Sequence, residues 1–228
     1  MFVGHIAVGL AAKKAAPKVS LGTLIMSAQF VDLLWPVFLL LGLEHVRIDP
    51  GNTAVTPLDF YDYPITHSLV GSLGWSVALG LVYFAARPSA RGAWIVGAAV
   101  FSHWILDAIT HRPDLALYPG CHTFVGLGLW NSLAGTVAVE LVMFALGIVL
   151  YLHSTEVRDR AGRYAFWSLI AVLAVLYVGN LVGPPPPSAR ALAVFSLGGW
   201  LFVAWAYWAD RHRQVTAASS APTGSSSP

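Results

Sequence analysis

His103, Asp107 and His111 recur at intervals of four residues in a stretch that is otherwise almost wholly apolar. At 3.6 residues per turn these positions share one face of a helix, with a drift of about 40° per step. Neighbouring members lie close enough for imidazole and carboxylate to bind one metal ion, or for the carboxylate to orient a ligating histidine. A hydrogen-bonded ladder between packed helices would use the same residue types. Both interpretations stay open, and we favour metal binding.

Three more ionisable residues, His5, Asp32 and His67, lie in other apolar stretches of the first half of the chain. Their depth follows from the number of residues to the nearest basic anchor, at about 1.5 Å per helical residue. This places His5 at least roughly 12 Å deep, His103 roughly 18 Å, Asp32 roughly 21 Å, Asp107 roughly 24 Å, and His67 and His111 roughly 30 Å. Ligands of one site must converge in depth, whereas independent packing residues need not.

The types of the candidate ligands limit which metal ions could bind. Imidazole and carboxylate without thiolate favour Zn²⁺, Mn²⁺ or Fe²⁺ over copper(I) or an iron–sulfur cluster. Cys121 is the only cysteine, which excludes an intrachain disulfide and a thiolate cluster. We therefore expect a divalent metal cofactor, with zinc preferred and manganese or iron as alternatives. With an open position, such an ion could activate water and polarise a carbonyl or phosphoryl oxygen.

The elements that position these residues follow from composition. Hydrophobic residues make up 57% of the 228 residues and charged residues 11%, about half the usual charged share. A soluble domain with so few charges could not cover its surface. The net charge of +2, without a basic patch interleaved with aromatic residues, excludes nucleic acid as a partner. We therefore predict an all-α fold, a polytopic helical membrane protein whose surroundings are membrane lipid.

Six stretches approach the roughly 20 residues needed to cross about 30 Å of hydrocarbon. They are Ser20–Leu43, Thr66–Ala86, Gly92–His111, Leu129–Leu152, Tyr164–Val182 and Ala191–Ala209. In this arrangement ten Lys and Arg residues fall on one side, and Arg47, Arg112 and Arg190 fall on the other. The positive-inside rule then predicts a bacterial-type inner membrane protein with both termini cytoplasmic and with 44–65 and 112–128 outside.

The two ends of the chain differ from the rest. The segment 1–16 is apolar but too short to span, and we predict a half-helix that dips into the membrane, with His5 deep and Lys13 and Lys14 at the surface. An amphipathic helix lying on the membrane is the alternative. We predict a metal-site membrane domain over 1–152, two further helices of the same bundle over 153–213, and a disordered tail over 214–228.

Other polar residues are assigned less specific roles. Glu140 is alone in its span, and it supports a metal ligand or a helix contact with equal weight. His45, His122 and His153 lie at span ends or in loops, where surface histidines are common. Asp59 is expected to be a solvated acid of an outer loop.

Four motifs resemble a family of small inner-membrane proteins described as membrane-bound, metal-dependent hydrolases. They are His5-Ile6-Ala7-Val8-Gly9, Phe30-Val31-Asp32-Leu33-Leu34, Thr66-His67-Ser68, and Ser102-His103 with Asp107, continuing through His111 to Asn131. The resemblance covers about residues 1–150 and implies His5, Asp32, His67, His103 and Asp107 as metal ligands. The family's acidic motif carries Pro before the first Asp and a second Asp two residues after it. Here Val31 stands in place of that Pro, and Leu34 stands in place of the second Asp. One carboxylate is therefore missing, which favours one metal ion over two.

The resemblance implies metal-dependent hydrolysis, and a lipid-like or phosphoester substrate is our expectation. Asp107 would be a ligand or a general base, and His111 would support the ligands or hold the substrate. A metal-ion or proton transporter is the first alternative, because His and Asp stacked through a membrane also describe a relay. A membrane adaptor without enzymatic activity is the second.

Overall fold

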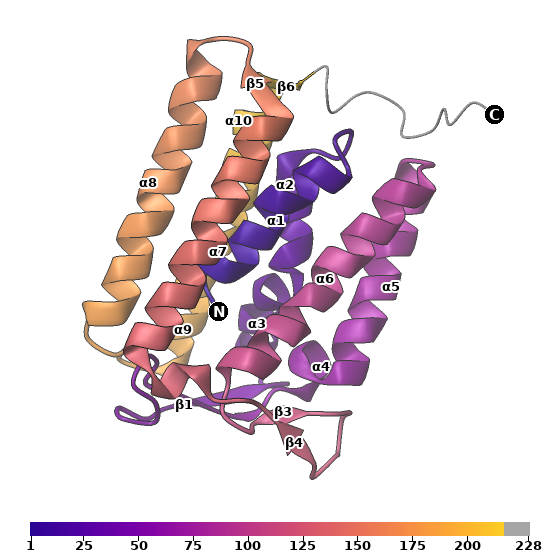
Figure 1. The fold of residues 1–228 in the computed structure, drawn as a ribbon. Helices are drawn as coiled ribbons and strands as arrows, with labels where there is room; N and C mark the ends of the chain where they lie inside the picture. The colour runs from indigo at the N-terminus through magenta and orange to yellow at the C-terminus, as the bar shows by residue number, and fades with distance from the viewer. Residues whose placement is uncertain (217–228) are drawn as a thin grey trace, which may run out of the picture.

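A computed structural model describes residues 1–216 as a bundle of helices with short strands at its two ends (Figure 1). The helices are α1 (Val3–Ala15), α2 (Leu21–Ala28), α3 (Phe30–Leu40), α4 (Pro64–His67), α5 (Leu69–Ala86), α6 (Ala90–Thr110), the 3₁₀ turn η1 (Leu129–Asn131), α7 (Leu133–Ser154), α8 (Arg160–Val182), α9 (Ala189–Ser196) and α10 (Gly199–Arg211). The strands are β1 (His45–Ile48), β2 (Leu58–Asp62), β3 (Leu115–Ala116), β4 (Phe124–Val125), β5 (Thr155–Val157) and β6 (Arg213–Val215).

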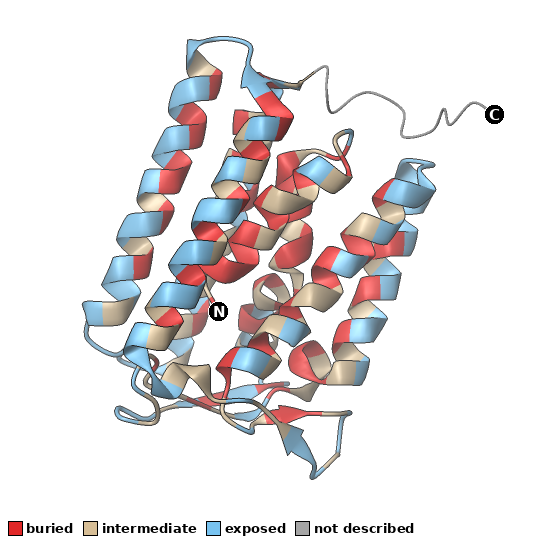
Figure 2. Ribbon diagram, in the orientation of Figure 1, coloured by how far each residue is buried: buried red, intermediate tan, exposed pale blue. Residues whose placement is uncertain are grey.

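The long helices have the length and composition of membrane spans. Five helical segments among residues 1–216 are long and apolar enough to cross a membrane, and the pair α2 and α3 makes a sixth if it counts as one span. Their outward faces carry apolar side chains, such as Leu81 on α5, Leu146 on α7 and Val175 on α8, which are 56–70% exposed. Figure 2 shows these exposed faces along the outer helices. The predicted mostly helical class is confirmed, and five or six helices of this length and composition fit a multi-pass membrane protein.

The first predicted span, Ser20–Leu43, is not one continuous helix. It divides into α2 and α3, which meet at Gln29 with a bend of 56°. The carbonyl of Ala28, at the bend, accepts a hydrogen bond of 2.8 Å from Nδ1 of His103. A side chain that takes a helix carbonyl in this way is a recognised cause of a sharp bend. The bend turns the first residues of α3, Asp32 among them, toward α6.

Other predicted spans begin or break differently. The stretch Thr66–Ala86 contains the one-turn helix α4, and α5 begins only after Ser68, whose side chain accepts a hydrogen bond from Gly71 N–H and caps α5. His111 is the residue that ends α6. The last stretch forms α9 and α10, which join at Leu197–Gly198. Apolar residues lie on both sides of the breaks at Ser68 and at Leu197–Gly198, so the apolar pattern did not locate them.

The loops contain strands that the all-α prediction did not include. Three antiparallel pairs form, β1 with β2, β3 with β4 and β5 with β6. The last pair joins Glu156 to Gln214 and Thr155 to Val215. The prediction of a disordered tail over 214–228 is therefore wrong for Gln214 and Val215, and residues 217–228 of that tail lie outside the described residues.

The half-helix α1 lies inside the bundle and packs against α2, α6 and α7. His5, Ile6 and Leu10 are all at most 2% exposed, as expected for a helix that is apolar all round. Close packing against α2 and α7 is possible because a glycine lies at each contact: a Cβ on Gly9 would come within 2.9 Å of Ile25 Cα, and one on Gly147 within 2.7 Å of Ala7 O. The alternative of an amphipathic helix on the surface is thus wrong.

The lysines at the end of α1 are not both at the surface as predicted. Lys14 is exposed, but Lys13 is only 4% exposed. Its Nζ donates hydrogen bonds of 2.9 Å to Val19 O and to Oδ2 of Asp210. The other end of α1 is also buried, since Met1 lies midway along the bundle and is 6% exposed (Figure 1).

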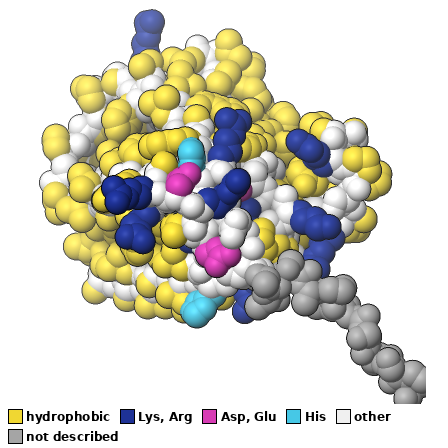
Figure 3. All heavy atoms as spheres, turned by 90° about the horizontal axis from the view of Figure 1, so that it is seen from above, with side chains coloured by type: hydrophobic (Ala, Val, Ile, Leu, Met, Phe, Trp, Pro, Cys, Tyr) yellow, Lys and Arg dark blue, Asp and Glu magenta, His cyan; other side chains and the backbone are white. Residues whose placement is uncertain are grey.

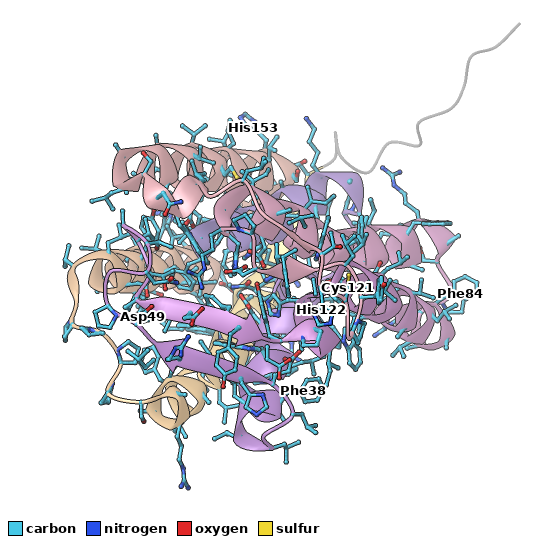
Figure 4. All side chains as sticks on the ribbon, turned by 90° about the horizontal axis from the view of Figure 1, so that it is seen from below. Phe38, Asp49, Phe84, Cys121, His122 and His153 are labelled. Carbon is cyan, nitrogen blue, oxygen red and sulfur yellow. The ribbon has the colours of Figure 1, made fainter. Side chains whose placement is uncertain are left out.

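Basic side chains gather at one end of the bundle. The connections α1–α2, α5–α6 and α7–α8 meet there with the end of α10 (Figure 1). Figure 3, which looks onto this end, shows Lys and Arg side chains around it. The ten residues concerned are Lys13, Lys14, Lys18, Arg87, Arg91, Arg158, Arg160, Arg163, Arg211 and Arg213. The hairpin β1–β2 and the pair β3–β4 lie at the opposite end (Figures 1 and 4).

Candidate metal centre

Five residues from four helices meet where α1, α3, α4 and α6 converge. They are the five predicted ligands His5, Asp32, His67, His103 and Asp107. One set of ligand atoms, from Asp32, His67 and His103, lies within 4.8 Å of one another, and so does a second set, from His5, His103 and Asp107. The convergence in depth that the sequence predicted is therefore present in the fold. Whether these residues bind a metal stays a prediction.

The first set has the spacing of a metal site. Oδ1 of Asp32 lies 3.3 Å from Nε2 of His67 and 3.5 Å from Nε2 of His103. Oδ2 of Asp107 lies 3.1 Å from His103 Nε2 and 3.9 Å from His67 Nε2. Four ligands placed tetrahedrally around an ion at about 2.0–2.1 Å lie about 3.3–3.4 Å apart. The spacing within Asp32, His67 and His103 is therefore close to that of a metal site, and Oδ2 of Asp107 lies beside the two imidazoles of this set.

His103 shows most clearly that a positive charge belongs here. Its Nδ1 donates to the carbonyl of Ala28, which can only accept, so Nε2 is the atom that faces Asp32 and Asp107. A neutral ring would direct a lone pair at two carboxylate oxygens, and a proton on Nε2 or a metal ion must lie between them. Nε2 is buried and has no well-oriented hydrogen-bond partner among the residues that the structure describes.

A chain of hydrogen bonds orients the ring of His67 so that its Nε2 also faces the centre. The hydroxyl of Thr66 donates to Oε2 of Glu44 at 2.7 Å, so its oxygen must accept the hydrogen bond of 2.6 Å from Nδ1 of His67. The backbone N–H of Thr66 donates to the other oxygen of Glu44 at 2.8 Å. Nε2 of His67 is left to face Asp32. Metal-ligating histidines are commonly oriented through their second nitrogen in this way.

His111 is oriented by the loop that follows α6. Its Nδ1 donates to Oδ1 of Asp114 at 3.0 Å, and the Tyr63 hydroxyl donates to the same oxygen at 2.7 Å. Burial, together with the charge of Asp114, raises the pKa of the Tyr63 phenol well above its ordinary value, so it stays a donor. The ring of His111 packs on Trp130, with centroids 4.1 Å apart. Nε2 of His111 then lies 3.8 Å from Oδ1 of Asp107.

His5 approaches Asp107 from the opposite helix. Its Nε2 lies 3.1 Å from Oδ1 of Asp107, and the amino group of Met1 donates a hydrogen bond of 2.9 Å to the same oxygen. Nδ1 of His5 is buried without a hydrogen-bond partner in the described part of the chain. Glu140 stands nearby on α7, and its Oε2 accepts hydrogen bonds from the backbone N–H groups of Phe2 and Gly4. It therefore caps the helix that carries His5.

The centre is enclosed on most sides and open at Asp32. The side chains of His67, His103 and Asp107 are at most 6% exposed, whereas that of Asp32 is 40% exposed. A separate hollow of about 250 Å³ lies at the end of the bundle opposite the basic residues, lined by Tyr61, Asp62, Tyr63, Pro64, Asp114, Ala116, Gly120, Cys121, His122 and Phe124. Tyr63 and Asp114 thus face both this hollow and His111.

Sequence reasoning did not assign the supporting residues. Glu44 and Tyr63 come from loop segments without periodicity, and neither gave a signal. Asp114 lies three residues after His111, a spacing that could have been noticed. Asp59 was expected to be solvated, yet it is 4% exposed and forms ion pairs with Arg47 and Arg112. The Asp59 carboxylate raises the pKa of the Arg47 guanidinium.

Comparison with known proteins gave no further guide. No protein-family model, curated protein or solved structure matches the chain. The family resemblance of the four motifs stays a prediction, and the functional argument depends on the geometry of the centre.

Proposed function

We propose that the protein is a membrane-embedded, metal-dependent hydrolase of a lipid-like ester or phosphoester. The observation that carries the proposal is His103 Nε2, a buried nitrogen that faces the carboxylates of Asp32 and Asp107 without a well-oriented hydrogen bond. Asp32, His67, His103 and Asp107 would hold the cation. Their nitrogen and oxygen donors suit zinc, with manganese or iron as alternatives.

The chain's own residues supply the orientation. Ala28 O fixes His103, and Glu44 fixes His67 through Thr66, so both rings present Nε2 to the centre. Both oxygens of Asp107 face imidazole nitrogens, which supports a ligand role for Asp107 rather than that of a free general base. A cation bound there would lower the pKa of a coordinated water to about 7 and polarise the substrate's carbonyl or phosphoryl oxygen.

The substrate class is supported by the direction from which the centre is open. Asp32 is its most exposed ligand, so a reacting group would approach from the side of α3. The exposed faces of the bundle are apolar, which suits a substrate whose tail stays in lipid while its polar group reaches Asp32. A purely water-soluble substrate would gain nothing from these surfaces.

Packing supports hydrolysis over transport. Between the centre and the basic end, α1 fills the interior with apolar side chains, and Leu10, Leu24 and Val96 are fully buried there. A relay across the membrane needs polar groups or water on both sides of the site. The polar chain from His103 through Asp107 and His111 to Asp114 instead runs toward one end only.

Metal content and hydrolysis measured on the same preparation test the proposal. Protein purified in detergent should contain transition metal by elemental analysis. It should cleave a fluorogenic short-chain phospholipid or a phosphomonoester, lose this activity to a chelator and regain it with Zn²⁺ or Mn²⁺. His103→Ala should lose both metal and activity, whereas His153→Ala, a change at an exposed residue on the far end of α7, should keep both.

The outcomes separate the alternatives. Protein without metal, or with equal metal in wild type and His103→Ala, would reject the metal centre. Metal without any chelator-sensitive hydrolysis, together with ion flux in liposomes, would favour the transporter.

A further inference from the structure

The two oxygens of Asp107 face different histidines. Oδ2 lies 3.1 Å from His103 and 3.9 Å from His67, on the side of Asp32. Oδ1 lies 3.1 Å from His5 and 3.8 Å from His111. A carboxylate surrounded in this manner can bind one cation through each oxygen.

The rings of His5 and His103 exclude a single shared ion. They stack with centroids 3.5 Å apart and planes 6° apart. The lone pair of an imidazole nitrogen lies in the plane of its ring, and two parallel planes have no point in common. One ion bound to both Nε2 atoms would lie far out of the plane of each ring. The stacked pair therefore serves two positions, one for each ring.

His111 supplies a third donor on the side of His5. Its Nδ1 is held by Asp114, so its Nε2 is directed at Oδ1 of Asp107. The side chains of His5, Asp107 and His111 are all at most 4% exposed. Buried imidazole and carboxylate are ligand types that divalent transition metals take in proteins.

We propose that the centre holds two cations bridged by Asp107. The first is bound by Asp32, His67 and His103 with Oδ2, and the second by His5 and His111 with Oδ1. This proposal rests on the metal centre proposed above, but not on the reaction assigned to it. It reverses the sequence-based preference for one ion, because the carboxylate missing near Asp32 is replaced by the second oxygen of Asp107 and by His111. The amino group of Met1, 2.9 Å from Oδ1, is the competing source of positive charge.

A pair of cations would also limit the chemical class of the substrate. Two metal ions about 3.5–4 Å apart can stabilise both the attacking and the leaving oxygen of a displacement at phosphorus, as in phosphatases and nucleases. Within the proposed hydrolase activity, the bridged pair therefore favours a phosphoester over a carboxylic ester.

Mn²⁺ binding to the full chain in detergent tests the second position. We expect two Mn²⁺ per chain by elemental analysis after removal of free ion, and an electron paramagnetic resonance spectrum with exchange coupling between neighbouring ions. His111→Ala should retain one Mn²⁺ with an uncoupled six-line spectrum. His67→Ala should also reduce the content from two to one, through loss of the other position, and His153→Ala should keep two.

Each outcome supports or contradicts one of the two metal positions. One uncoupled Mn²⁺ per wild-type chain would overturn the second position and leave the first, with Met1 as the cationic partner of Oδ1. No bound Mn²⁺ would overturn both positions. Two coupled Mn²⁺ without phosphoester hydrolysis would support the paired site and reject the reaction. The wild-type stoichiometry and spectrum decide even if a variant fails to fold, and His111→Gln provides a second, milder replacement.

Discussion

Glu140 and Gly4 connect the middle of α7 to the first turn of α1: Oε2 of Glu140 accepts the backbone N–H of Gly4 at 3.1 Å and also that of Phe2 at 3.0 Å. The first N–H groups of a helix have no partner within the helix, and α1 begins in the interior of the bundle, where water does not satisfy them. The carboxylate also places negative charge at the positive end of the helix dipole. His5 follows directly, so Glu140 determines where the first donor of α1 lies.

Replacement of Glu140 by alanine should therefore destabilise the protein and weaken metal binding. Two N–H groups inside the bundle would lose their acceptor, and each loss would reduce the free energy of unfolding by about 1–3 kcal/mol. We expect a clear fall in the thermal midpoint in detergent, and a lower Mn²⁺ content even at temperatures where the variant is folded. Glu140→Gln keeps one acceptor oxygen and should recover most of both losses. Equal behaviour of the two variants would show that the charge, and not the capping, matters.

Thr66 should control metal affinity without contact to the metal. Thr66→Val preserves the shape of the side chain but removes the oxygen that joins Glu44 to Nδ1 of His67. Loss of such a supporting group typically costs 10–100-fold in affinity, and we expect a decrease of about that size in a titration with Zn²⁺ against a competing chelator. Thr66→Ser restores the hydroxyl and should bind nearly as wild type. An unchanged affinity in Thr66→Val would argue against this chain of hydrogen bonds.

The buried lysine at the basic end should contribute strongly to stability. Lys13 and Asp210 form an ion pair whose side chains are 5% and 12% exposed, and Asp210 also accepts from Leu21 N–H and the Tyr151 hydroxyl. Removal of one partner of a buried pair typically costs about 3–5 kcal/mol, because the other charge stays buried alone. Lys13→Met should therefore lower the thermal midpoint sharply, while the neighbouring Lys14→Met, at an exposed position, should change it little. Similar midpoints for both variants would contradict this.

The sequence predicted the parts of the centre that obey helical periodicity. His103 and Asp107 share a helical face because they are four residues apart, and this depends only on local geometry. Counting residues from the basic anchors placed Asp32 at roughly 21 Å and His67 at roughly 30 Å, both in the middle or outer half of the membrane. These predictions needed only a straight helix and the positions of charged residues.

What the sequence did not predict depends on contacts between distant residues. The bend at Gln29 coincides with a hydrogen bond from His103, which is 75 positions from its acceptor Ala28. Lys13 can be buried because its Nζ pairs with Asp210. This partner lies 197 positions away in the sequence, so no local pattern predicts the pair. The supporting role of Glu44 requires that the loop after α3 fold back over α4, and loop conformation leaves no periodic pattern.

Labelling of Cys121 tests the orientation of the bundle in the membrane. Cys121 follows β3 at the end opposite the basic residues (Figure 4), so we expect an impermeant maleimide to modify it in intact cells. The Thr123 N–H donates a hydrogen bond of 3.2 Å to Sγ and lowers the pKa of the thiol. Since the thiolate is the reactive form, the labelling rate should be substantial at neutral pH and fall as the medium is acidified. For the control, Glu156→Cys in a Cys121→Ser background places a thiol at the basic end, which should react only after the membrane is permeabilised. Reversal of these two patterns would invert the predicted topology and would place the hollow at Tyr63 and Asp114 on the cytoplasmic side.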